Sequence, residues 1–122
     1  MSEKIGEKSK HKFDIHERIF GFVIRVIKLS KSLYKTPQNL IIINQITRSA
    51  TSIGANDQEA DGAQTRKDFH HCFTIVKKEI KETNYWLNII YKTNFHLQIR
   101  MKNLIQEGRE LESIISSIVS KT

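Results

Sequence analysis

The sequence predicts an all-α protein, a single antiparallel, up-down-up-down four-helix bundle. Across four segments, apolar residues recur at alternating spacings of three and four, which is the periodicity of a helix with one buried face. No segment shows the two-residue alternation of a strand. The connections between the segments are short, so consecutive helices are expected to be antiparallel neighbours.

Capping residues indicate where the helices begin. Asp14 precedes the first apolar stripe, and an aspartate accepts hydrogen bonds from the free N–H groups of a first turn. Thr36 and Pro37 separate the first helix from the second, because proline is tolerated in the first helical turn. Thr65 is the expected cap of the third helix, which should end near residues 93–94 before the fourth begins.

Each helix is expected to bury one apolar stripe in a common core. In chain order the stripes are Ile15, Ile19, Phe22, Val26, Leu29 and Leu33; Ile42, Ile43, Ile46, Ala50 and Ile53; Phe69, Phe73, Val76, Ile80, Thr83, Leu87 and Ile90; and Leu97, Met101, Leu104, Gly108, Leu111, Ile115 and Ile118.

The chain of 122 residues is long enough for one domain with a core and short for two. We expect this domain to occupy residues 13–120. The first twelve residues carry four lysines and little that could be buried. We therefore expect residues 1–12 to form a flexible basic tail.

An extra apolar stripe includes Ile75, Trp86 and Ile89 on the third helix, and Phe20, Val23, Ile24 and Ile27 on the first. A monomeric bundle needs only one buried face per helix, so the extra stripe predicts a homo-oligomer with these residues at the interface. A wide core-facing stripe in a monomer is the alternative.

A polar seam follows the second helix beside its apolar stripe. Counting from a turn centred near residues 63 and 64 places Arg48 opposite Glu79 and Gln45 opposite Glu82 on the third helix. A guanidinium can bind a carboxylate through two hydrogen bonds, so we expect a satisfied layer that fixes the helix register. The alternative is an enzyme that uses the two glutamates. The seam comprises Gln45, Arg48, Ser49, Ser52, Asn56, Glu59, Glu79 and Glu82.

The chain has 20 Lys and Arg but only 13 Asp and Glu, which gives a net charge of +7. This positive charge favours an acidic partner. Nucleic acid is the commonest such partner. Cations follow one side of the first and third helices, although such rows can also be an ordinary solvated face. Few aromatic residues lie in these rows, so base stacking is not expected. The rows contain Arg18, Arg25, Lys28, Lys31, Lys35, Lys77, Lys81 and Lys92.

No metal or cofactor site is expected. Consecutive residues on a helix point about 100° apart, so the side chains of residues 70–72, His-His-Cys, cannot converge on one ion. Asp57, Glu59 and Asp61 alternate between faces and are expected in solvent. Phosphate-loop, dinucleotide, zinc-protease and hydrolase motifs do not occur.

We expect a cytoplasmic protein with no membrane partner. The N-terminal residues lack the apolar region of a signal peptide. The apolar runs fall far below the roughly 18 residues that span a bilayer. Cys72 is the single cysteine, so no internal disulfide can form.

The sequence pattern of the polar seam resembles that of a known family. The pattern Gln, two residues, Arg-Ser, two, Ser-Ile, two, Asn, two, Glu runs from Gln45 to Glu59. It resembles that of the small bacterial four-helix-bundle proteins named after reading frames in 23S rRNA intervening sequences. Residues 66–69 and 78–87 are similar to the family's third helix, whereas Ala60 stands where many members have Gly.

The resemblance implies an antiparallel protomer in a ring-like homopentamer, without enzyme activity. A related branch, the accessory variability determinant of diversity-generating retroelements, is similar in fold and charge and binds nucleic acid and a reverse transcriptase. We therefore expect non-specific binding of RNA, DNA or both. The alternative is an oligomeric scaffold for a protein partner such as a reverse transcriptase.

Overall fold

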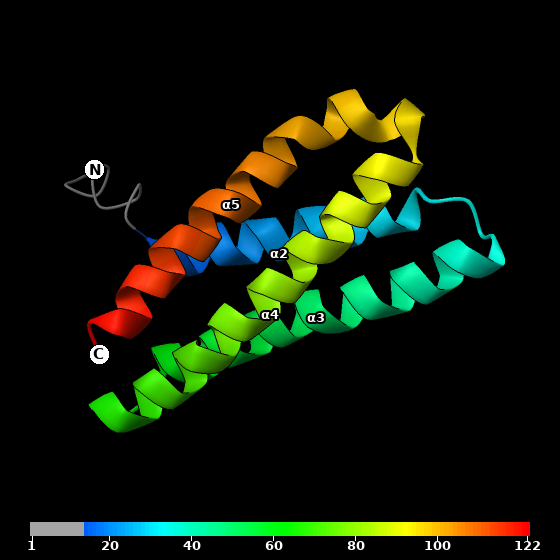
Figure 1. Ribbon diagram of the computed structural model, residues 1–122. Helices are drawn as coiled ribbons and strands as arrows, with labels where there is room; N and C mark the ends of the chain where they lie inside the picture. The colour runs from blue at the N-terminus through cyan, green and yellow to red at the C-terminus, as the bar shows by residue number, and fades with distance from the viewer. Residues whose placement is uncertain (1–13) are drawn as a thin grey trace, which may run out of the picture.

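The computed structural model describes residues 14–122, and these form a helical bundle (Figure 1). Within that range there is no strand, so the predicted all-α class is confirmed. The tail predicted over residues 1–12 lies outside the described part of the chain. The elements are the helices α2 (Ile15–Lys31), α3 (Pro37–Asp61), α4 (Arg66–Thr93) and α5 (Gln98–Ser120), with a short 3₁₀ helix η1 (Phe95–Leu97) before α5.

The predicted caps begin three of the helices. The Asp14 side chain accepts hydrogen bonds from the backbone N–H groups of His16 and Glu17 at the start of α2. Thr36 and Thr65 accept one backbone hydrogen bond each at the starts of α3 and α4. These bonds satisfy N–H groups that have no partner within the helix.

Side-chain amides mark the end of α4. Asn94 donates to the carbonyl of Ile90 at 3.0 Å, and Gln98 donates to the carbonyl of Tyr91 at 2.8 Å. These carbonyls belong to the last turn of α4, where no backbone donor follows. Helix α5 therefore starts from η1 without a side-chain cap of its own.

The four helices enclose one core. Each helix packs on the next along the chain, and α2 also packs on α5. Figure 1 shows α3 beside α4, with α2 and α5 completing the bundle. All predicted stripe residues are buried except four near helix ends or edges, which are half-buried. Those four are Ile15, Ile43, Phe69 and Ile118.

Gly108 allows α5 to lie close to α4 and α2. A Cβ atom at this position would collide with the side-chain amide oxygen of Asn84 and would lie 3.1 Å from the ring of Phe22. The Asn84 amide nitrogen donates to the carbonyl of Gly108 at 3.0 Å and to the carboxylate of Glu112 at 2.8 Å. An amide on α4 thus rests directly on the backbone of α5.

We predict that Gly108→Ala lowers the free energy of unfolding by about 1–3 kcal/mol, because the added methyl group must displace the bonded Asn84 amide. Gly21→Ala is the matched control, since nothing lies within 4 Å of a Cβ built there. That change should stabilise the protein by about 0.4–1 kcal/mol. Urea denaturation of both variants measures the difference, and equal effects would contradict the close approach at Gly108.

Candidate functional site: a polar seam and two basic hollows

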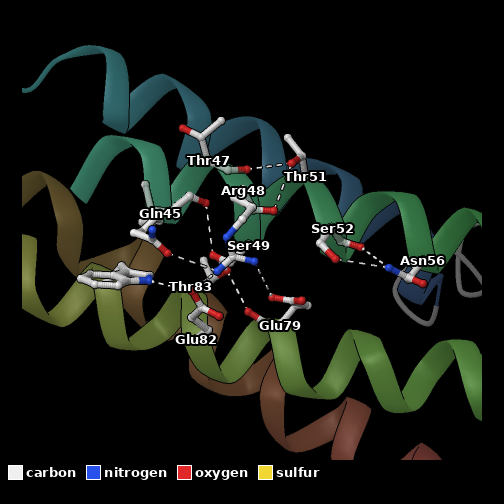
Figure 2. A network of polar contacts seen from close by, with 12 residues as sticks. Gln45, Thr47, Arg48, Ser49, Thr51, Ser52, Asn56, Glu79, Glu82 and Thr83 are labelled. Carbon is white, nitrogen blue, oxygen red and sulfur yellow. Dashed lines mark hydrogen bonds and ion pairs between the residues drawn. The ribbon is translucent and has the colours of Figure 1, made fainter. Parts of the chain in front are cut away.

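The polar seam joins α3 to α4 through Arg48 (Figure 2). The Arg48 guanidinium donates to the Glu82 carboxylate and, at 3.3 Å, to the side-chain oxygen of Gln45. A second guanidinium nitrogen lies 3.8 Å from Glu79. The predicted pairing of Arg48 with Glu79 is therefore present only as a longer ion pair, and Glu82 is the hydrogen-bonded partner.

The register differs from the predicted one because counting from the connection ignores displacement along the helix axes. Ser49 meets Thr83 across the interface, with 2.7 Å between their hydroxyl oxygens. Both residues are completely buried. Each hydroxyl also lies within hydrogen-bond distance of a carbonyl in its own helix. This pair is the satisfied centre of the seam, and sequence reasoning had placed Thr83 in the apolar stripe.

Glu79 is the poorly satisfied member of the seam. It is 7% exposed, and its Oε1 atom has no hydrogen-bond partner among the described residues. The Arg48 guanidinium, 3.8 Å away, is the cation beside it. Glu82 is better satisfied, because it also accepts from the indole N–H of Trp86 at 3.1 Å. A buried carboxylate with so few partners depends on the Arg48 charge.

The C-terminal half of the seam does not cross to α4 in the same way. Asn56 donates to the carbonyl and hydroxyl oxygens of Ser52, within α3 itself (Figure 2). Glu59 is exposed. The seam predicted as one layer thus has a cross-helix part, from Gln45 to Ser49, and a part satisfied locally.

Asp57 is buried, which corrects the prediction that it is solvated with Glu59 and Asp61. It is 2% exposed, and its carboxylate lies 2.7 Å from Nδ1 of His16 on α2. The other ring nitrogen of His16 lies 3.2 Å from Asp61. Burial raises the pKa of Asp57, and the hydrogen bond from His16 opposes that shift. The prediction considered α3 alone and therefore missed its packing against α2.

Several cations of the predicted rows already have partners. Arg18 donates to Glu107 at 2.7 and 3.0 Å and to Glu110 at 3.1 Å, and these bonds raise the pKa of its guanidinium. Lys81 lies 3.9 Å from Glu112. The Lys35 ammonium donates to backbone carbonyls at the end of α2. Half-buried Lys77 is also less available than the exposed lysines.

Two basic hollows flank the first half of α5, and both use cations that sequence reasoning missed. The predicted rows lie only on the first and third helices, whereas Arg100, Lys102 and Arg109 belong to the fourth, α5. The α4/α5 hollow, of 420 Å³, is lined by Asn88, Tyr91, Lys92, Lys102, Ile105, Gln106 and Arg109. The α2/α5 hollow, of 140 Å³, is lined by Arg25, Lys28, Leu29, Arg100 and Leu104. Lys31, also on α2, is exposed.

Neither a metal cluster nor a membrane span is found in the described part of the chain. Over residues 14–122, no three His, Cys, Asp or Glu side chains gather as metal ligands would. None of the helices in that range is both long enough and apolar enough to cross a bilayer.

The fold and seam define a small all-α protein whose helices are joined by a polar contact between α3 and α4. A family described as 23S rRNA-intervening sequence protein matches residues 11–117. The chain belongs to this family, as its seam indicated.

A solved structure from Bacteroides thetaiotaomicron supports the assignment. It is described as a protein of unknown function from the S23 ribosomal protein family. The two chains are 32% identical, with a TM-score of 0.76, over 86% of this chain and 97% of that one. None of the curated proteins compared with the chain matches it.

We predict that Arg48→Met destabilises the protein by about 1–3 kcal/mol, because it leaves the Glu79 carboxylate buried without a cation. The double variant Arg48→Met/Glu79→Met should be more stable than Arg48→Met alone, since both charges are then gone. Glu82→Gln is the control, as a partly exposed pair contributes under about 1 kcal/mol. Chemical denaturation of the wild type, the two single Met variants and the double variant gives a double-mutant cycle. If the losses of the two single variants add up to that of the double variant, Arg48 and Glu79 are not directly coupled.

Proposed function

We propose that the protein is a non-enzymatic homo-oligomer whose basic surface binds RNA, DNA or both without sequence specificity. The observation that carries the proposal is the convergence of cations from three helices on the two hollows beside α5. Cations arranged in this way can follow a phosphate backbone. The name of the family refers to ribosomal RNA, and that of the Bacteroides protein's family refers to ribosomal proteins, which supports an RNA partner.

A non-enzymatic role is part of this proposal. The Glu79 and Glu82 carboxylates lie beside Arg48, and the neighbouring hydroxyl groups of Ser49 and Thr83 bond to each other. Such a layer can hold two helices in register, whereas catalysis would need an activated nucleophile or a base aimed at a substrate. We place the protein in the cytoplasm.

The proposed oligomer is a homopentameric ring of up-down-up-down protomers, with the outer face of α3 and α4 in the interface. Ile75, Trp86 and Ile89 are half-buried in the protomer. On the same two helices, Ile41 of α3 is 63% exposed and Tyr85 of α4 is 57% exposed. Large apolar side chains that remain this exposed are typical of a surface covered by another subunit.

The alternative function is an oligomeric scaffold for a protein partner such as a reverse transcriptase. A separate group of exposed apolar residues favours it, because Phe95 and Ile99 are each 86% exposed where α4 meets α5. Tyr34, which stacks on His96 with ring centroids 5.5 Å apart, extends this surface. Binding to a protein through these residues would depend little on salt.

We predict that binding to short RNA and DNA weakens as salt rises. Each phosphate neutralised contributes about −0.9 to the slope of log K against log salt for duplex DNA and about −0.7 for a single strand. Arg25→Glu/Lys28→Glu, in the α2/α5 hollow, should flatten the slope by roughly 1.4–1.8. Fluorescence anisotropy at several salt concentrations measures it.

The control for that experiment is Arg66→Glu/Lys67→Glu, which changes the net charge equally at the start of α4, whereas the α4 residues of the α4/α5 hollow, Asn88, Tyr91 and Lys92, lie at its end. It should leave most of the slope unchanged. No binding by the wild-type protein at low salt would favour the scaffold function instead.

We predict a single native mass of five protomers of 14.2 kDa each. Trp86→Ala should reduce this mass, because large aromatic residues contribute most at interfaces. Ile41→Asp should do the same without disturbing the core, since that side chain is largely exposed. Phe95→Asp, at a position that is 86% exposed where α4 meets α5 and outside the proposed interface, is the control and should leave the mass unchanged. A monomeric wild-type protein at micromolar concentration would exclude the oligomer.

A further inference from the structure

The carboxylates of α5 all have partners. The three glutamates of the helix are all engaged: Glu107 and Glu110 by Arg18, and Glu112 by Asn84 and, at 3.9 Å, by Lys81. Gln106 also donates to Glu110 at 3.0 Å. The acidic groups of α5 are therefore held by partners on other elements or on its own surface.

The cations of the α4/α5 hollow are left without such partners. The ion pairs found among residues 14–122 involve none of Lys92, Lys102 and Arg109. All three residues are exposed and line the same hollow, and no carboxylate lines it with them. Three neighbouring cations with no anion between them repel one another, and a bound phosphate group would relieve this repulsion.

The hollow is more than a charged patch, because it also has an apolar wall. Tyr91 from α4 and Ile105 from α5 line it, and both are half-buried against the core. Asn88 and Gln106 place side-chain amides beside them. Its volume of 420 Å³ lies within the roughly 300–1,000 Å³ range of small-ligand sites. An aromatic ring, two amides and three cations are the groups that recognise a base together with its phosphate.

We propose that the α4/α5 hollow binds one nucleotide of a single-stranded nucleic acid, with the phosphate on Lys102, Arg109 and Lys92 and the base against Tyr91. The proposal rests on the nucleic-acid function proposed above. It replaces the sequence-based expectation that base stacking plays no part, since that expectation considered the rows of cations without the residues of α5. A base can enter a hollow between two helices only when it is unpaired, so the ligand is a single strand and not a duplex.

The second hollow gives the strand a path beyond the bound nucleotide. Lys102 and Arg100 are two residues apart on α5, a rotation of about 200°, so their side chains leave the helix on nearly opposite sides. Arg100 lines the α2/α5 hollow with Arg25 and Lys28. A strand that leaves the α4/α5 hollow across α5 would therefore meet cations on the other side of the helix, which is about 10–12 Å wide.

The test compares a short single-stranded RNA with an abasic strand that has the same number of phosphates, by fluorescence anisotropy with the full chain. Tyr91→Leu should weaken binding of the RNA by roughly 5- to 150-fold, the equivalent of about 1–3 kcal/mol for one stacked base. It should leave binding of the abasic strand unchanged. Tyr91→Phe is the matched control, since it keeps the ring and should keep the affinity. Circular dichroism confirms that both variants are folded.

The phosphate contacts are tested with Lys102→Ala/Arg109→Ala, two exposed positions whose change should not disturb the core. The slope of log K against log salt should flatten by about 1.4 on the single strand. The inference is overturned if Tyr91→Leu weakens both strands equally or neither, or if the double variant keeps the full slope. In either case the proposed function stands as long as Arg25→Glu/Lys28→Glu flattens the slope, whereas a wild-type protein that binds no strand at low salt overturns both.

Discussion

The close contact between α4 and α5 at Gly108 is the constraint on which the basic surface depends. Asn84 of α4 donates to the backbone of α5 at this glycine, and a Cβ atom there would collide with the bonded Asn84 amide. The α4/α5 hollow lies beside this contact, since Asn88 follows Asn84 by one turn and Arg109 follows Gly108 directly. Helix separation here sets how near Lys92 on α4 comes to Lys102 and Arg109 on α5, so a packing contact determines the local charge density.

The arrangement of ion pairs concentrates the positive potential of a chain with a net charge of +7 on one face. Arg18 holds Glu107 and Glu110 on one side of α5, where their charges are compensated. The cations nearer α4 remain unpaired within the described chain. Surface ion pairs add little stability by themselves, but here they decide where positive potential accumulates. Such a field attracts a polyanion to one face and not to the whole surface.

The seam between α3 and α4 has a different role. Its centre is the buried contact between the Ser49 and Thr83 hydroxyls, and its outer edge is Arg48 with two glutamates. Hydrogen bonds of this kind penalise any sliding of α3 along α4, because a displaced hydroxyl would be buried without a partner. The family pattern from Gln45 to Glu59 therefore includes residues that fix the helix pair, whereas the hollows lie beside α5, outside that pattern.

By itself, the sequence determined the helices and most of what they bury. The apolar spacing and the caps at Asp14, Thr36 and Thr65 are local features, and they predicted the helices and nearly all of the core correctly. Family membership likewise followed from the local pattern of the seam. Only the tertiary structure decided which side chains contact one another across helices, because the distance between them depends on the axial displacement and rotation of the helices. It paired Arg48 with Glu82, buried Asp57 against His16, and brought Tyr91 together with Lys102 and Arg109.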